Sequence, residues 1–556
     1  MSGKKTWFII GGAAVVVASG VAGYVYLKYS PAEVSTAIGG AKFVPDAALM
    51  SAFVSNDPQV WSKLQNFGTP EAQTLISQQL KQLQENFLAK NNLDLEKDLQ
   101  SWVGGVTIAV LPSQKSLPSS DDRSSLNSPE NSKNSEAKIM LVVGIKDKLN
   151  AMNFASKIKS QSKNETSKSS DYQGVTINFN GENTYSALVS DYVVLSAQKK
   201  IVEQAINTFQ GKETSLVNKS EIYIAQNPQL KNSLATAFIP DYGALLQELA
   251  SNSPENKSPI PSNFNQLKPI KSVFMGLSVD NNGLRFQATA KIDSQSFKGN
   301  QTPTPGKVVN LFPPQTLALI SGQGINQIWS NLLEQSQQSP ELKTKIEGIK
   351  QGMKTVNLDA DKEVFPWMNG EFAISAIASE QVLPYNFGGV LVLETSDRPG
   401  AETTLKKLDD FAKKNTLNVE TRTIEDKTIT EWKIPFQGAL LGHGWLNENS
   451  MFVAIGGSPL ADVMVTKSNN SLSNSDGFKA IAGSLPNSNQ GYFYLDVDQT
   501  MSLVNRKLSQ VPGSQLPPDF NAIVNSIRGI AITTNWLDSS TSQLEMFLAL
   551  KPTIKK

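Results

Sequence analysis

The feature that most constrains this chain is an internal repeat. The stretch NLDLEKDLQSWVGG, which begins at Asn92, returns as NLDADKEVFPWMNG from Asn357, a shift of 265 residues. The same shift carries Trp102 onto Trp367. Similarity at a fixed spacing is typical of a repeated structural unit. We therefore expect the chain to build one kind of domain twice.

The segments around each tryptophan support this expectation. Alternating apolar residues predict strands at 105–112 and 370–377, polar amphipathic patterns predict helices at 71–90 and 339–354, and a strand followed by a helix is expected after each tryptophan strand. The pattern predicts an α+β fold: an N-terminal transmembrane helix, then two homologous domains of mixed, mainly antiparallel sheet with helices packed on one side. In each domain the expected order is helix, strand, strand, helix and several paired strands.

The repeated acids, lysine, tryptophan and glycines could belong to an active site or to architecture. A duplicated fold must repeat its packing residues, whereas a catalytic group is rarely needed twice. We interpret Trp102 and Trp367 as anchors of a helix-to-strand corner, with Gly105 and Gly370 allowing the turn. The acids differ between the copies, DLEKDLQ against DADKEVF, and are interpreted as a capped, solvated helix end.

Composition shifts suggest the boundaries. Residues 1–30 form a membrane anchor, residues 31–293 the first repeat domain, residues 294–308 a linker rich in polar residues, Pro and Gly, and residues 309–556 the second repeat domain. Within the first domain, the serine-rich stretch 113–136 is expected to be a disordered insertion between two strands, and 251–263 a mobile loop.

The amino terminus carries an uncharged apolar run from Trp7 to Leu27. At 1.5 Å per residue its length is roughly 30 Å, which matches the hydrocarbon core of a bilayer. A cleaved signal peptide is the alternative, although its apolar region should be shorter. Flanking lysines favour a cytoplasmic amino terminus, with the body of this single-pass protein outside the cytoplasm.

Small residues recur within this apolar run. Ala14, Ala18 and Ala22 share one helix face, which would let two copies pair as a homodimer through the membrane helix. The spacing alone does not separate this role from the general abundance of alanine in membrane helices.

Composition excludes several chemistries. The chain has no cysteine and a single histidine, His443, so thiolate catalysis and multi-histidine metal sites are excluded. A net charge of +1 offers no field for nucleic acid, and we expect no nucleic-acid partner. His443 is expected to be a partly exposed strand or turn residue.

Other short motifs lack complete ligand sets. Acids near Asp359 and Asp496 lack the rest of a calcium loop, and the DNNG at Asp280 reads as a hairpin turn. Gly456 and Gly457 precede a predicted helix but lack a phosphate-loop lysine. We expect no metal, no cofactor and no assignable catalytic residue, without excluding a hydrolase that uses serine or carboxylate groups.

The early VPDAAL, the helical stretch and then NLDLEKDLQSWVGGVTIAVL resemble the bacterial, largely cyanobacterial family known as domain of unknown function 3352. The resemblance covers the chain after the anchor and rests on the spacing of Asp98, Trp102, Gly104 and Gly105. The second copy departs from it, with Glu363 and Asn369 at two of these places. The family is uncharacterised, so the resemblance implies no catalytic residues. Its cyanobacterial members imply the periplasm or the thylakoid lumen as the place of the protein body.

Three functions remain open. The anchor, the duplication and the lack of chemical motifs favour a non-enzymatic binding or scaffold protein with a protein or lipid partner. The alternatives are a carrier of an apolar ligand such as a lipid or pigment and, third, a hydrolase.

Overall fold

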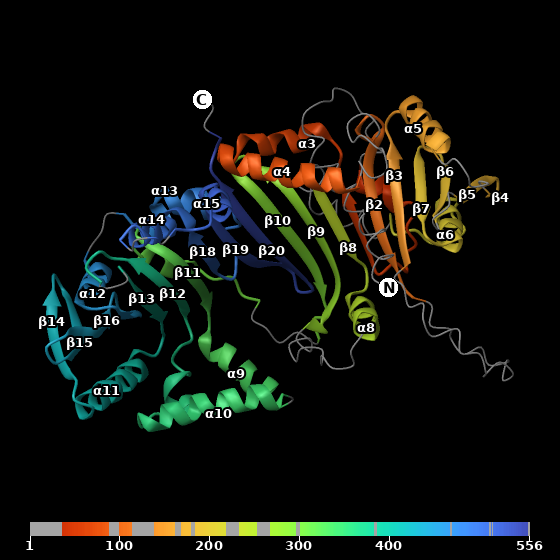
Figure 1. Ribbon diagram of the computed structural model, residues 1–556. Coiled ribbons are helices and arrows are strands. Elements are labelled where there is room, and N and C mark those ends of the chain that lie inside the picture. Colours follow the sequence, from red (N-terminus) through yellow and green to blue (C-terminus); the bar gives the residue numbers. More distant parts are fainter. Residues whose placement is uncertain are drawn as a thin grey trace. The chain divides into compact units, whose positions relative to one another are not determined.

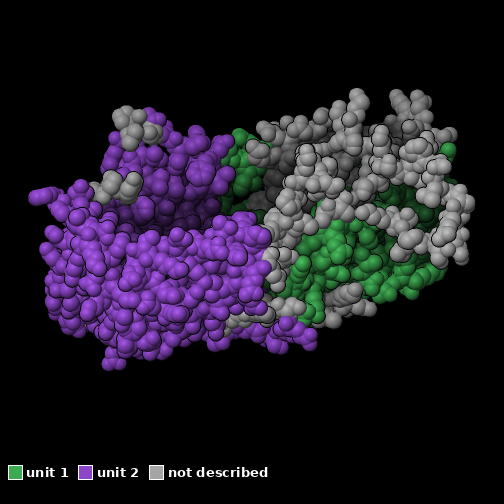
Figure 2. Space-filling model, turned by 90° about the horizontal axis from the view of Figure 1, so that it is seen from below, with its two compact units in different colours: residues 1–293, 552–556 green, residues 294–551 purple. Residues whose placement is uncertain are grey.

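The chain folds into two compact units, each described by itself from a computed structural model. Unit 1 comprises residues 1–293 and 552–556, and unit 2 comprises residues 294–551 (Figure 2). The structure describes residues 36–87, 99–113, 138–161, 168–179, 184–217, 233–252, 267–295, 301–337, 339–382, 386–466, 470–510, 513 and 515–553.

The described part of unit 1 contains one antiparallel sheet. Its spatial order is β4 (Lys168–Tyr172), β5 (Val175–Phe179), β6 (Tyr185–Val189), β7 (Tyr192–Ser196), β3 (Lys138–Ile145), β2 (Val103–Leu111), β1 (Met50–Val54), β8 (Ala235–Ile239), β9 (Ile270–Asp280) and β10 (Gly283–Ile292).

Unit 2 has a sheet of the same order (Figure 1). It runs β14 (Asn418–Ile424), β15 (Lys427–Ile434), β16 (Gly438–Trp445), β17 (Ser450–Ile455), β13 (Phe387–Glu394), β12 (Glu371–Ala378), β11 (Thr316–Gln323), β18 (Tyr492–Asp496), β19 (Ile527–Asp538) and β20 (Thr541–Leu550). Each strand of unit 1 thus has a counterpart numbered ten higher in unit 2, and every described pairing in both sheets is antiparallel. The mixed component that we predicted is absent from these pairings.

Helices connect the strands. In unit 1 they are α2 (Ala37–Ala41), α3 (Pro58–Ser62), α4 (Pro70–Phe87), α5 (Lys148–Gln161), α6 (Lys199–Phe209) and α8 (Tyr242–Asn252), with η2 (Lys63–Asn66). In unit 2 they are α9 (Ile325–Ser336), α10 (Pro340–Thr355), α11 (Arg398–Lys414), α12 (Ser458–Val465), α13 (Asp476–Ala482), α14 (Val497–Leu508) and α15 (Pro518–Asn525), with η8 (Val308–Leu311), η9 (Ala360–Val364) and η10 (Leu472–Asn474).

The prediction that helices pack on one side of the sheet was wrong. Met140 and Val142 of β3 pack in one cluster with the buried side of α6. Val143 and Ile145 point to the opposite face, because side chains alternate along a strand, and they pack with Phe154 of α5. The strand sequence KIMLVVGI is apolar on both faces, and such a strand requires cover on both.

Unit 2 repeats this two-sided packing. Val390 and Val392 of β13 share a core cluster with residues of α12 and α13. Leu391 and Leu393 face the other way and pack with Ala401 of α11. The helices α9 and α10 form a hairpin of their own, seen side by side in Figure 1, which encloses a smaller cluster with residues of η9.

One inner strand of each sheet, β1 or β11, is a second difference from the predicted order. β1 and β11 each lie between two other strands of their sheets. β1 and β11 lie in two similar segments, FVPDAALMSAF from Phe43 and LFPPQTLALIS from Leu311, for which the expected order contains no strand. The hairpin predicted at Asp280 is confirmed: β9 and β10 pair across Asn281 and Asn282.

The membrane-anchor prediction concerns residues 1–30, which lie outside the described residues, as do most of 113–136 and 251–263. Among the residues that the structure describes, no helix has the length and apolar character needed to cross a bilayer.

Candidate functional site

One face of the unit 2 sheet carries apolar side chains that remain open to solvent. Ile320 of β11 lies directly opposite Ile374 of β12 on one side and opposite Phe493 of β18 on the other. Residues paired across strands point to the same face of a sheet. Their exposed fractions are 52% for Ile320, 54% for Ile374 and 37% for Phe493. We call this face of the unit 2 sheet the open face.

The apolar surface extends beyond these three side chains. Following the strand register, the row continues through Leu391 on β13, Ile532 on β19 and Met546 on β20. A second row, two residues along each strand, contains Ala376, Ala318, Leu495, Ile530 and Leu548. No residue of either row is charged.

The opposite face of the same strands is closed. Leu319, Tyr494 and Phe547 alternate with the open-face residues and are each 1% exposed or less. They pack in the main core cluster of unit 2 with Phe478 and Ile481 of α13. The strands therefore have two apolar faces, of which one is buried under helices of the chain and the other keeps large exposed side chains. Contiguous exposed apolar surface usually marks a binding site.

The corresponding surface of unit 1 is lined by smaller side chains. Pairing places Ala52 of β1 opposite Ile108 of β2 and Ala237 of β8. Ala52 and Ala237 thus occupy the places that Ile320 and Phe493 hold in unit 2. Ile108 corresponds to Ile374, which is a shift of 266 residues and not of 265. The residue exactly 265 positions before Ile374 is Ala109, and its side chain faces the other side of the sheet. The constant shift of 265 therefore fails beyond the tryptophan.

The two tryptophans predicted at the corners are buried, Trp102 at 6% and Trp367 at 4% exposure. Trp102 packs against Phe154 with ring centroids 5.4 Å apart. The Trp367 indole donates to Thr404 Oγ1 of α11 at 3.2 Å. In both units the tryptophan backbone carbonyl accepts a hydrogen bond from the residue that directly follows β3 or β13. Lys146 N donates to Trp102 at 2.8 Å, and Thr395 Oγ1 donates to Trp367 at 2.6 Å.

The two glycines occupy different settings. Gly105 lies inside β2, where the pairing register with β3 shifts between Val103 and Val106. Gly370 immediately precedes β12, and a Cβ there would lie 2.6 Å from the Glu394 carbonyl oxygen. Gly370 is thus required by a close backbone approach, and Gly105 lies at a β-bulge.

The acids before Trp367 form a capped turn, as predicted for the second copy. Asp359 accepts hydrogen bonds from the Asp361 and Lys362 amides, and Glu363 accepts from the Asp359 amide at 3.0 Å. Glu363 also forms an ion pair with Lys407 of α11. The hydrogen bond and the charge of Lys407 hold the pKa of Glu363 below its usual value. The matching acids of the first copy, Asp94 and Asp98, lie outside the described residues.

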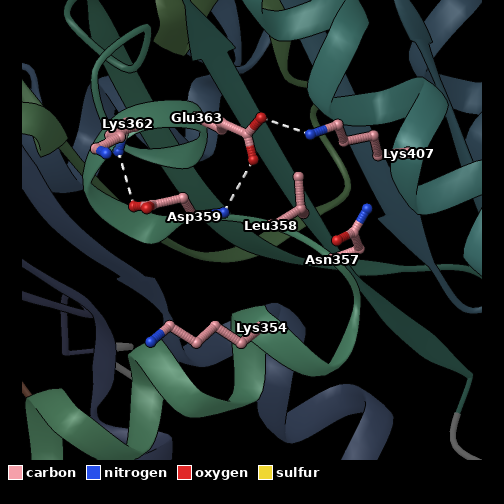
Figure 3. A pocket seen from close by; sticks show the side chains of 7 residues that line it. All are labelled: Lys354, Asn357, Leu358, Asp359, Lys362, Glu363 and Lys407. Atoms are coloured by element: carbon pink, nitrogen blue, oxygen red, sulfur yellow. Dashed lines mark hydrogen bonds and ion pairs between the residues drawn. The ribbon is translucent and has the colours of Figure 1, made fainter.

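A polar pocket of about 470 Å³ lies beside this turn. Figure 3 shows Glu363 between its two partners, with the Lys354 side chain extending separately from α10. The residues that line the pocket are Lys354, Asn357, Leu358, Asp359, Lys362, Glu363 and Lys407. The two carboxylates of the pocket, Asp359 and Glu363, are both engaged by the capped turn, and Glu363 also by Lys407. The pocket therefore does not present a free carboxylate for general acid–base catalysis.

The sole histidine is in a strand, as predicted, but it is buried rather than partly exposed. His443 of β16 is 6% exposed and its Nε2 lies 2.9 Å from Asp409 Oδ1 of α11. The same oxygen accepts the Trp432 indole N–H at 2.7 Å. The expectation of partial exposure failed because His443 has no visible partner nearby in the sequence, whereas α11 supplies Asp409 from 34 residues earlier. The arrangement fixes α11 to the sheet.

The weaker candidates also have structural partners. Asp496 caps α14 by accepting from the Gln499 amide at 2.9 Å. Gly457 precedes α12, as expected from the sequence. Among the described residues, no group of three or more His, Cys, Asp or Glu side chains could hold a metal ion. Ala14, Ala18 and Ala22 lie outside the described residues.

The open face was not anticipated, although its signal is present. The β11 sequence TLALISGQ is apolar at consecutive positions, so it offers apolar side chains to both faces of the sheet. Sequence alone could not reveal which of the two faces the chain's own helices leave open.

Comparisons with solved structures give only distant matches. TP0453 in crystal form IV has 12% identity and a TM-score of 0.25, with 45% of this chain and 80% of that chain covered. Crystal form III of TP0453 has 12% identity and a TM-score of 0.25, with 47% of this chain and 82% of that chain covered. Scores this low carry no argument about fold or function. No curated protein matches the chain.

The match to a family model is extensive. A model described as "Protein of unknown function (DUF3352)" matches residues 9–550 of the 556-residue chain. The resemblance predicted from the spacing around Trp102 is thereby confirmed. The chain belongs to the DUF3352 family.

Proposed function

We propose that this protein is a non-enzymatic binding or scaffold protein that engages an apolar partner surface through the open face of unit 2. The observation that carries the proposal is the uncharged row of Ile374, Ile320 and Phe493, which is exposed on a sheet whose other face is fully packed. Covering such a row removes apolar area from water, at roughly 25 cal/mol for each Å².

The polar clusters support a binding role over catalysis. Asp359 serves as a helix cap, and Glu363 holds α11 through Lys407. Asp409 is engaged by both His443 and Trp432. Each cluster joins elements of the fold, and in none of them is a nucleophile placed beside a general base.

The proposal includes duplication and membrane attachment. The shared strand order and the paired tryptophans support two homologous domains. The apolar run Trp7–Leu27 supports a single-pass anchor with the body in the periplasm or thylakoid lumen, and Ala14, Ala18 and Ala22 support pairing of two anchors. Alkaline carbonate extraction of membranes tests the anchor: release of the full-length protein would contradict it.

A carrier of an apolar ligand is the second candidate. The small side chains of Ala52 and Ala237 make the equivalent row in unit 1 less filled than in unit 2. Organic extraction and mass spectrometry of the purified full chain would test it. A stoichiometric lipid or pigment would favour the carrier, and an empty extract would exclude it.

The experiment for the main proposal is cross-linking mass spectrometry on the full-length protein in its native membrane. An Ile320→Ser/Ile374→Ser variant is compared with Ile76→Ser, a control at an isoleucine of α4 that is also 54% exposed. We expect the double variant to lose its cross-links to other proteins and the control to keep them. Equal cross-linking in wild type, double variant and control would refute the open face as the binding surface.

A further inference from the structure

We infer that the occupant of the open face is an amphipathic α-helix of a partner protein, which packs on the unit 2 sheet beside α11. This inference rests on the proposed binding function and names the kind of partner. Three features support it: the backbone pairing of the sheet, the side chains of the two apolar rows, which form the floor of the open face, and the helix α11, which already covers the neighbouring strands.

The backbone of the floor excludes an extended peptide. β12, β11, β18 and β19 are each paired with a strand on both sides, so the centre of the open face has no free sheet edge. A peptide strand laid on this face would leave its own N–H and C=O groups without partners, which is costly in a dry contact. An α-helix satisfies these groups internally.

The chemistry of the floor requires an apolar contact surface. Neither row of the open face supplies a charge or a side-chain hydrogen-bond donor, since both consist of Ala, Ile, Leu, Met and Phe. A bound acyl chain would also satisfy this requirement. Ligand sites, however, bury roughly 70–90% of a small ligand, whereas a chain on an open sheet keeps one side in water. An amphipathic helix presents its polar side to that water.

The open face continues a helix-covered surface of the same sheet. Leu391 packs in the cluster of α11 with Ala401 and Leu405, and it is also the cross-strand partner of Ile374. Strands lie about 4.8 Å apart and packed helices about 8–10 Å apart. A second helix beside α11 would therefore lie about two strands further along, over Ile374 and Ile320.

The dimensions also agree. β11 and β12 have eight residues each, which corresponds to roughly 26 Å of strand. α11 has 17 residues, or roughly 26 Å of helix. The partner helix should thus have at least four turns, with apolar residues at spacings of three and four and no charge within that stripe.

The test places the photoreactive residue p-benzoylphenylalanine singly at positions 320, 374 and 493 of the full-length protein in its native cells. Position 76, with the same exposure as 374, is the control, and thermal unfolding checks that each variant folds. We expect adducts at each of the three sites to exceed those at position 76, because residues that contribute most to binding cluster near the centre of an interface.

The residues captured on the partner decide the inference. Adducts three and four residues apart within one partner segment would establish the helix, and replacing that stripe by serine should abolish them. Adducts two residues apart or adducts on lipid would each overturn the helix while leaving binding at the open face intact. Adducts within a single copy of this chain would overturn the proposed function too, because the face would then be covered by the chain itself. Adducts no more frequent than at position 76 would overturn the proposed function as well.

Discussion

Ile320 and Leu319 are neighbours in β11 and belong to different environments. Leu319 is 1% exposed in the core cluster of unit 2, whereas Ile320 is 52% exposed on the open face. The alternation of a single strand thus separates a residue that holds the fold from one that is free to bind. This pair allows stability and binding to be tested separately.

Truncation of the two neighbours should have unequal effects. Leu319→Ala leaves a cavity in a packed core and should lower the free energy of unfolding by about 2–5 kcal/mol. Ile320→Ala removes side-chain area that is already half in water and should cost less than about 1 kcal/mol. Urea denaturation of both variants measures the difference. Similar losses would mean that Ile320 is covered in the folded chain and that the face is closed.

Gly370 should not tolerate a methyl group. A Cβ at this position would meet the Glu394 carbonyl at 2.6 Å, so Gly370→Ala should destabilise by about 1–3 kcal/mol through overpacking. Gly348, in α10, has open space around it, since a Cβ added there would meet nothing within 4 Å. The matched Gly348→Ala should raise stability by about 0.5–1 kcal/mol because alanine favours a helix. Unchanged melting temperatures for both substitutions would contradict the close approach of Gly370 to the Glu394 carbonyl.

Asp409 should matter more than the acid beside it. Asp409→Ala leaves the Trp432 and His443 ring nitrogens without their shared acceptor, which should cost about 1–3 kcal/mol. Asp410 follows it on α11 and is exposed, so Asp410→Ala should change the unfolding free energy by less than about 0.5 kcal/mol. Chemical denaturation compares the two. Equal effects would show that the shared acceptor contributes nothing to holding α11.

Much of the secondary structure could be predicted because its signals are local. The strand KIMLVVGI, the DNNG hairpin and the amphipathic helices α4 and α10 each follow from spacing within a few residues. The α+β class follows from their order. Asp359 was predictable as a cap because an N-cap carboxylate bonds amides two and three residues ahead.

The parts that sequence could not supply depend on distant neighbours. The burial of His443 comes from α11, more than thirty residues earlier in the chain. The two-sided packing follows from which helix returns to which face, and this is set by connection lengths and by sheet twist. The open face is harder still to predict, because it depends on which strands the helices of the described chain leave uncovered.

Arg422 should stabilise unit 2 in a pH-dependent way. Its guanidinium lies 2.7 Å from Glu431 Oε1, and the Glu431 side chain is 1% exposed. Burial alone would raise the pKa of Glu431, but the hydrogen bonds of Arg422 and Ser458, together with the charges of Arg422 and Lys433, outweigh it and hold that pKa below its usual value. A carboxyl whose pKa is lowered on folding contributes stability above its unfolded pKa, and this contribution is lost as pH falls through the folded pKa.

Arg422→Met should therefore destabilise the protein at pH 7 by up to about 3 kcal/mol, because it removes the nearer cation from the buried Glu431 and leaves Lys433, at 3.7 Å, as the remaining ion-pair partner. The loss should shrink as pH falls below the usual pKa of a glutamate, about 4.3, since a protonated Glu431 no longer needs the cation. Arg506 offers a matched control, because its ion pair with Glu380 is largely exposed and Arg506→Met should cost less than about 1 kcal/mol at either pH. Urea titrations at pH 7 and pH 3.5 measure all four values. A loss for Arg422→Met that is the same at both pH values would show that packing of the arginine stem, and not the charge on Glu431, is what the substitution removes.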